Sequence, residues 1–176
     1  MIRQTRSRVE RNAAQPFLVM GYLTVAVSIA VWFALRATHN PIWHLLWFVI
    51  PIAGLFYNGI VRRANREKAV TTYIDRVVGY VWWVFGSAAV LCSLLSFFVR
   101  LDILFIILLT MGMGTTITGL IIRFRPATAG GTAAIVLAPV SLIVSGYWMP
   151  TLFAVGFVVM MIIPGCLLYT SDAADD

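Results

Sequence analysis

Long apolar runs alternate with short polar segments along most of the chain. A helix that crosses a hydrocarbon core of about 30 Å needs roughly 20 apolar residues, and six stretches approach that length. Polar or charged residues, often with a proline, mark the ends of these stretches. The pattern predicts an all-α integral membrane bundle with six transmembrane helices, over about residues 17–35, 42–61, 77–99, 103–122, 129–147 and 151–165 or slightly beyond.

The polar segments indicate how these helices are connected. Residues 36–41, 100–102 and 148–150 are short connections, so each is expected to join two antiparallel helices. Residues 62–76 and 123–128 then lead from one pair to the next. The sequence therefore predicts three consecutive hairpins in one transmembrane domain, residues 17–165, after a basic segment over residues 1–16. The first run is too long for a secretory signal and lacks an Ala-x-Ala-like cleavage site, so we expect a retained helix.

Basic residues gather on one side of the membrane in this topology. Only Arg36 and Arg100 fall on the side opposite to the two termini. Because basic loops stay in the cytoplasm, both termini are predicted to be cytoplasmic. The predicted cytoplasmic basic face consists of Arg3, Arg6, Arg8, Arg11, Arg62, Arg63, Arg66, Lys68, Arg76, Arg123 and Arg125.

Composition supports a membrane protein and excludes other classes. Hydrophobic residues make up 61% of the chain and charged residues 11%, whereas soluble domains are about a quarter charged. Two cysteines are too few for a disulfide scaffold. The net charge of +6 follows from the basic face, which we expect to lie against anionic lipid headgroups, with no nucleic-acid partner. Alternatively, residues 1–12 and 62–76 dock a soluble partner.

Ionisable groups are missing at membrane depth. Proton and ion relays need such groups, and intramembrane proteolysis needs paired carboxylates, a Ser–His couple or a metal. Asp75, Arg100 and Asp102 all lie at the ends of the predicted spans. His39 and His44 precede the second helix without a nearby carboxylate or thiol, so they form a poor metal site. We therefore expect no enzyme, no cofactor and no bound metal.

Small residues recur at heptad spacing in three of the helices. Because lipid removes most of the hydrophobic drive between helices, close packing of small residues takes its place. We predict a helix-packing seam in the bundle core, flanked by Ala127, Thr110, Thr115, Thr118 and Gly119, and formed by Gly79, Gly86, Ser93, Gly114, Gly131, Ala134, Ala138, Ser141 and Ser145. The alternative is a pore or substrate path lined by the hydroxyls of Thr110, Thr115, Thr118, Ser141 and Ser145. Such hydroxyls can, however, form hydrogen bonds with carbonyls of their own helices.

The last residues, 166–176, break every earlier trend. They place three of the seven acidic residues at one end, and their sequence CLLYTSDAADD resembles a translated transposase adaptor of the kind used to prepare sequencing libraries. Processing and cloning scars should be excluded from fold reasoning. We therefore predict that residues 166–176 are not native and that native sequence ends near Gly165. Otherwise residues 166–169 complete the sixth helix and the acids form a short cytoplasmic tail.

Four stretches carry a family resemblance: residues 47–51, 72–76, 105–114 and 159–165, which read WFVIP, TYIDR, FIILLTMGMG and VMMIIPG. On these stretches, the chain from about Arg6 to Gly165 resembles a family of small, uncharacterised bacterial multi-pass membrane proteins. The resemblance implies a bacterial inner-membrane location and agrees with six helices. It supplies no activity and no catalytic or binding residues.

The sequence thus favours a non-enzymatic inner-membrane protein that acts by association, either with itself as a homo-oligomer or with an unknown membrane or cytoplasmic partner. The basic face, the small-residue seam and the lack of ionisable groups at depth point in this direction. The alternative is a transporter or channel component with a path lined by helices four and five.

Overall fold

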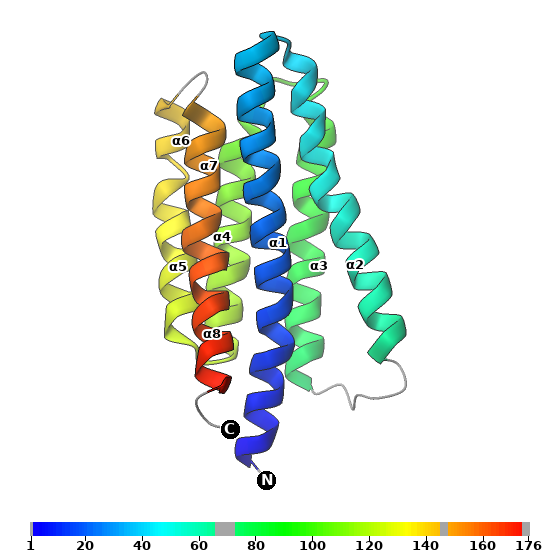
Figure 1. Ribbon diagram of the computed structural model, residues 1–176, viewed down its shortest axis with the longest axis vertical. Coiled ribbons are helices and arrows are strands. Elements are labelled where there is room, and N and C mark those ends of the chain that lie inside the picture. The colour runs from blue at the N-terminus through cyan, green and yellow to red at the C-terminus, as the bar shows by residue number, and fades with distance from the viewer. Residues whose placement is uncertain (1, 66–72, 145–147, 174–176) are drawn as a thin grey trace.

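The computed structural model describes residues 2–65, 73–144 and 148–173, and in that part of the chain every regular element is helical. Side chains are described outside residues 2–14, 41, 58, 60–65 and 171–173. Figure 1 shows the elements as a bundle of roughly parallel and antiparallel rods. In chain order they are α1 (Ile2–Thr38), η1 (Pro41–Phe48), α2 (Val49–Asn65), α3 (Tyr73–Leu95), α4 (Ile103–Ile121), α5 (Arg125–Leu137), α6 (Val140–Ile143), α7 (Met149–Phe157), η3 (Val158–Ile162) and α8 (Ile163–Ala173).

Five helices are long and apolar enough to cross a membrane. They cover Gln15–Thr38, Tyr73–Leu95, Ile103–Ile121, Arg125–Ile143 and Met149–Thr170. The predicted all-α, multi-pass membrane architecture is thereby confirmed. The second predicted span differs, because its apolar helical part, Ile42–Tyr57, is shorter than a full crossing. A sixth crossing through η1 and α2 therefore stays a prediction.

Prolines explain several irregularities in these rods. Pro41 opens η1, where the Asn40 side chain accepts a hydrogen bond from the Ile42 amide at 3.0 Å. Pro51 lies in the first turn of α2, just after η1 ends at Phe48. Pro139 separates α5 from α6, so the predicted fifth span is two helical pieces rather than one. Pro164 follows the single π turn, η3, in the last rod.

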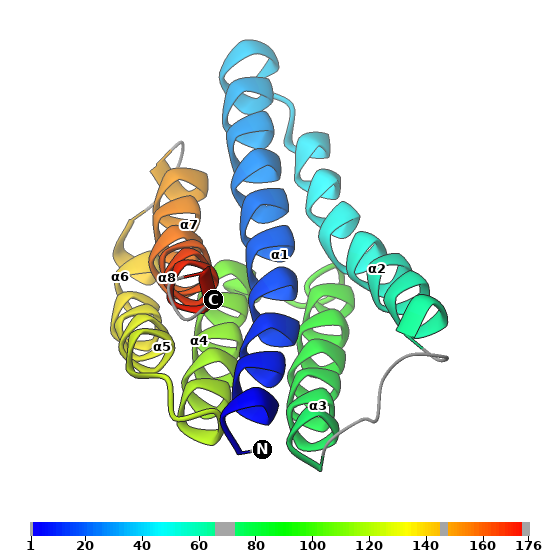
Figure 2. The same ribbon diagram turned by 60° about the horizontal axis from the view of Figure 1, so that its bottom comes forward.

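The rods divide into a packed centre and a looser side. Figure 2 shows α1 in the middle, with α4, α5 and the α7–η3–α8 rod on one side and α2 and α3 on the other. The start of α1 and the end of α8 lie at the same end of the bundle (Figure 1). α4 and α5 pack most extensively, whereas α2 contacts mainly α1 and η1. The hydrophobic core therefore lies between α1, α4, α5 and the α7–η3–α8 rod.

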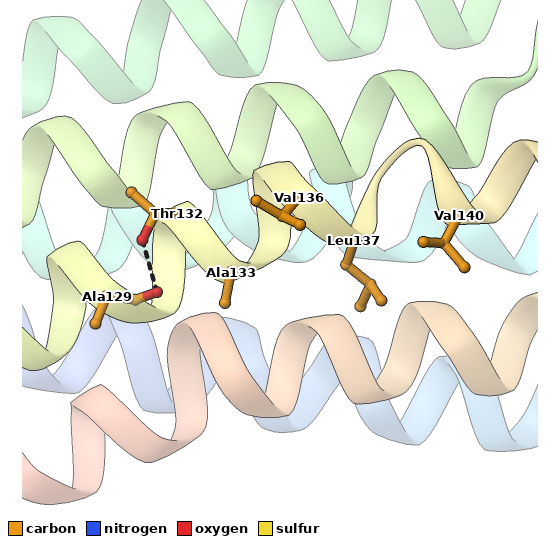
Figure 3. Close-up of a pocket in the computed structure, with 6 residues that line it drawn as sticks. All are labelled: Ala129, Thr132, Ala133, Val136, Leu137 and Val140. Carbon is orange, nitrogen blue, oxygen red and sulfur yellow. Dashed lines mark hydrogen bonds between the residues drawn. The ribbon is translucent and has the colours of Figure 1, made fainter.

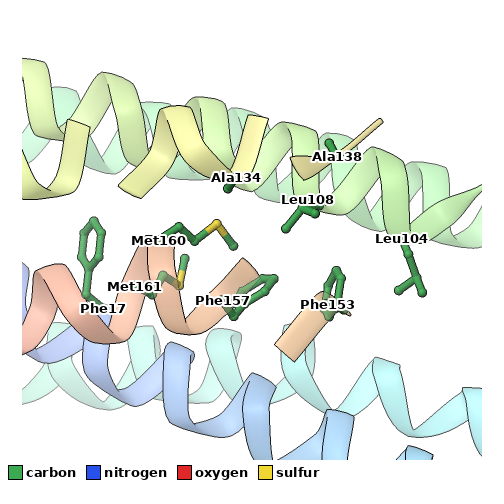
Figure 4. Close-up of a cluster of buried hydrophobic side chains, with 9 residues drawn as sticks. All are labelled: Phe17, Leu104, Leu108, Ala134, Ala138, Phe153, Phe157, Met160 and Met161. Carbon is green, nitrogen blue, oxygen red and sulfur yellow. The ribbon is translucent and has the colours of Figure 1, made fainter. Parts of the chain in front are cut away.

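Figure 4 shows this core, in which aromatic and thioether side chains fill the space between facing helices. Leu108 and Met160 are completely buried, and the Phe153 ring lies 4.8 Å from that of Phe157. Such large side chains require small partners opposite them if the rods are to approach closely. The cluster comprises Phe17, Leu104, Leu108, Ala134, Ala138, Phe153, Phe157, Met160 and Met161.

Candidate functional site

The contact between α4 and α5 is the most extensive in the bundle, and glycines lie on both sides of it. A Cβ atom added at Gly119 would lie 2.5 Å from the backbone nitrogen of Thr128. One added at Gly131 would lie 2.5 Å from that of Thr116, and one at Gly112 would lie 3.0 Å from the Gly131 oxygen. Real Cβ atoms do not come as close to backbone atoms as at Gly119 and Gly131, so the two helices touch main chain to main chain there.

Most of the small residues predicted in the fifth span are buried. Gly131, Ala134, Ala138 and Ser141 are all buried, while Ser145 lies outside the described residues. Sequence reasoning gave little weight to Gly112, which also lies close to the backbone of α5. Its spacing of seven from Gly119 is the signal that could have identified it.

Gly114 pairs with a different helix. A Cβ atom there would meet the rings of Phe85 at 3.5 Å and Trp82 at 3.8 Å, both from α3. Next to it, Trp82 Nε1 donates a hydrogen bond to Thr118 Oγ1 at 3.1 Å. The contact between α3 and α4 therefore consists of two aromatic rings placed against a glycine and a threonine, rather than of two facing stripes of small residues.

The glycines of α3 do not take part in the packed core. An added Cβ atom at Gly79 or Gly86 would meet nothing within 4 Å. Ser93 is half-buried, and its hydroxyl donates to the Ala89 carbonyl at 2.8 Å. We predicted that this stripe faces the small residues of helices four and five, and the structure corrects that expectation. The reason is that Trp82 and Phe85 occupy the α4-facing side of α3.

Most of the described seam hydroxyls donate hydrogen bonds to backbone carbonyls three or four residues earlier in the chain. Thr110 donates to the Ile106 carbonyl at 2.7 Å, Thr118 to Gly114 at 2.7 Å, and Ser141 to Ala138 at 2.6 Å. Thr115 is completely buried, and its Oγ1 has no hydrogen-bond partner among the described residues. Seam hydroxyls bonded in this way stabilise their own helices and need no permeating ligand.

Two shallow, adjoining grooves lie along α5, the first on its outer face and the second between its start and the end of α4. Each has a volume of about 420 Å³, and they share Ala129 and Thr132. Figure 3 shows the first groove, along which the labelled side chains point away from the ribbon of α5. Its lining is completed by Ala133, Val136, Leu137 and Val140. The second groove continues to the connection between α4 and α5, and its lining is completed by Gly119, Leu120, Arg123, Arg125 and Thr128.

The charged side chains that the structure describes lie near the two ends of the bundle. Arg76, Arg123 and Arg125 are exposed and belong to the end of the bundle where α1 starts (Figure 1). The other members of the predicted basic face lie outside the described side chains. At the opposite end, the Arg36 guanidinium lies 5.1 Å from the centroid of the Trp32 ring. Arg100 and Asp102 also lie at this end, and Asp75 lies beside Arg76 at the other.

Metal binding finds no support in the described part of the chain, where no three His, Cys, Asp or Glu side chains come together. No family model, curated protein or solved structure matches this chain. The resemblance to uncharacterised bacterial membrane proteins therefore stays a prediction.

The α4–α5 contact gives a prediction about stability. We expect Gly131→Leu to reduce the free energy of unfolding by about 1–3 kcal/mol, since the new side chain must displace the backbone of α4. Gly59→Leu is the matched control, because a Cβ atom at Gly59 in α2 would meet nothing within 4 Å. Thermal unfolding in mild detergent measures both variants. Equal unfolding temperatures would contradict the close contact.

Proposed function

We propose that this protein is a non-enzymatic, multi-pass membrane protein that acts by associating with a second copy of itself through α3. The observation that carries the proposal is the unfilled strip at Gly79 and Gly86. We place the protein in the bacterial inner membrane, with both termini in the cytoplasm and the basic face against anionic lipid headgroups, as the arginine distribution favours.

The contacts of glycines elsewhere in the bundle support this proposal. At Gly130, an added Cβ atom would lie 2.5 Å from the Val159 oxygen, and at Gly156 it would lie 2.6 Å from Leu108. Each of these glycines admits a neighbouring helix, as small residues do where helices associate in lipid. Gly79 and Gly86 offer the same close approach and have no helix against them. A second chain can supply that helix.

The surroundings of the strip support the same conclusion. Only 6% of the α3 span is buried, against 44% of the last span. Large side chains next to the strip, Tyr80 and Trp83, are 63% and 71% exposed. Aromatic residues supply much of the contact energy in protein interfaces. In a symmetric dimer, the same face of each copy would pack against the other, and the spacing of seven between the glycines suits left-handed helix pairing.

A path between helices four and five receives less support. Glycine contacts bring the two backbones together, and the described seam hydroxyls except that of Thr115 bond within their own helices. The first groove lies on the outer face of α5 (Figure 3), and the second reaches α4 only at the end where the two helices are connected. These observations favour helix packing as the role of the hydroxyls.

Self-association predicts the effect of filling the strip. We expect the double variant Gly79→Leu, Gly86→Leu to convert a dimer into a monomer, because four added leucines would hold the two α3 helices apart. The monomer itself should fold normally, since both positions are open. Cross-linking in native membranes and light scattering in mild detergent measure the state, with Gly59→Leu as the matched control. A wild-type protein that is monomeric in both would refute the proposal.

The alternative path also gives a measurable outcome. After Cys92 and Cys166 are replaced by serine, we expect Thr118→Cys and Ser141→Cys to resist a water-soluble thiol reagent in intact membranes, since both positions are buried. Thr38→Cys, exposed at the end of α1, is the positive control. Rapid labelling at position 118 or 141 would show that water reaches the seam and would favour a path.

The nature of residues 166–176 is a separate proposal. α8 continues through Ala173, and Leu168 is buried, so these residues extend the last rod. We nevertheless propose that they derive from an adaptor, because of their sequence. Resequencing the source DNA should show a different sequence after the codon for Gly165. A genomic sequence that encodes the same residues would overturn this proposal, and neither the α3 strip nor the α5 grooves would change.

A further inference from the structure

The two connected grooves on α5 form one continuous surface, here called the α5 groove, that is apolar along its length and basic at one end. Its apolar part runs from Ala129 to Val140. At 1.5 Å per residue this distance is about 16 Å, which matches one leaflet of a hydrocarbon core about 30 Å thick. The basic part is formed by Arg123 and Arg125, where α4 connects to α5.

The positive charge at this end is available to a ligand. Arg123 and Arg125 are both exposed, and within the described residues neither guanidinium forms an ion pair or a side-chain hydrogen bond. Of the acids whose side chains are described, Asp102 precedes α4 and so lies at the other end of that helix, whereas Asp75 lies in the first turn of α3, at the same end of the bundle as the two arginines (Figure 1). The groove therefore combines a track for an acyl chain with two cations at the depth of the headgroups.

The backbone conformation at Arg123 favours glycine, so the presence of an arginine there bears on the role of its side chain. α4 ends in a Schellman motif, in which the Phe124 amide donates to the Gly119 carbonyl at 2.8 Å and the Arg123 amide to Leu120 at 3.2 Å. The residue at the position of Arg123 has φ of 55°. Glycine occupies this position most often, because a side chain is strained there. An arginine at a place where glycine would be more stable suggests that its guanidinium is used.

We propose that the α5 groove binds one anionic phospholipid, with an acyl chain along Ala129–Val140 and the phosphate at Arg123 and Arg125. Basic pockets beside transmembrane helices on the cytoplasmic side bind such headgroups. A helix of a second copy would fit the groove less well, because the candidate spans that the structure describes offer a single acidic side chain, Asp75 in the first turn of α3, to meet two cations. The proposal is independent of self-association through α3, which lies elsewhere in the bundle (Figure 2).

The test measures lipid binding to the full-length protein in mild detergent. We expect dioleoylphosphatidylglycerol to raise the unfolding temperature, and native mass spectrometry to show one retained molecule per chain. Dioleoylphosphatidylcholine and inorganic phosphate should produce neither effect. A similar response to phosphatidylcholine would overturn the role of charge, and a response to phosphate alone would indicate an anion site without a lipid.

Substitution of Arg123 distinguishes the effect of its guanidinium on lipid binding from the effect of its backbone conformation on stability. We expect Arg123→Gly to weaken phosphatidylglycerol binding about fivefold, as one fewer cation near the membrane surface implies. Its unfolding temperature without lipid should equal or exceed that of wild type, since glycine relieves the strained φ. Arg100→Gln, which removes an exposed arginine at the other end, is the matched control and should bind normally. Unchanged affinity in Arg123→Gly would overturn the proposal.

Substitution of the apolar part tests the acyl chain. Ala133→Trp should fill the groove and weaken retention of the lipid, whereas Ala26→Trp, also at an exposed alanine but on α1, should not. Equal retention in both variants would contradict a bound chain in the groove. A change of oligomeric state in Ala133→Trp, without added lipid, would instead identify the groove as a protein interface and overturn the assignment.

Discussion

Close approach of backbones at glycine is the constraint on which the bundle depends. In lipid, apolar side chains gain little by leaving the solvent, so helices associate through packing at short range and through hydrogen bonds. α4 and α5 achieve this through Gly112, Gly119 and Gly131, which bring main chain against main chain. The large core side chains can then reach across the centre, because Gly156 receives Leu108 and Gly21 lies against Met161.

The π turn in the last rod is accommodated by the same means. At its end the Ile163 amide donates to the Val158 carbonyl, so the next bond in this series would run from residue 164 to Val159. Pro164 has no N–H to donate. The Val159 oxygen instead faces Gly130 of α5, where a side chain would collide with it. A carbonyl that lacks its helical hydrogen bond is tolerated at membrane depth where protein covers it. Here Gly130 lets α5 approach closely enough to cover the Val159 oxygen.

Sequence reasoning predicted the architecture well and the packing in part. Apolar runs are enough to identify spanning helices, because the length of a span is set by the bilayer. They do not show that Pro139 divides the fifth rod or that the second is short. The predicted small residues from Gly131 to Ser141 are buried. The α3 stripe does not, because small residues permit a close approach without specifying the partner, and Trp82 and Phe85 take the contact with α4.

The unequal packing of the two sides has a physical basis in the membrane. A transmembrane helix is stable in lipid before it meets a neighbour, since its backbone bonds are internal. α2 and α3 therefore need few contacts within their own chain, unlike the helices of a soluble bundle, which unfold if left unpacked. A Cβ atom added at Gly79 or Gly86 of α3 would meet nothing within 4 Å, so this strip makes no close helix contact within the single chain. The proposed self-association uses α3 for this reason, since small residues are where helices approach closely in lipid.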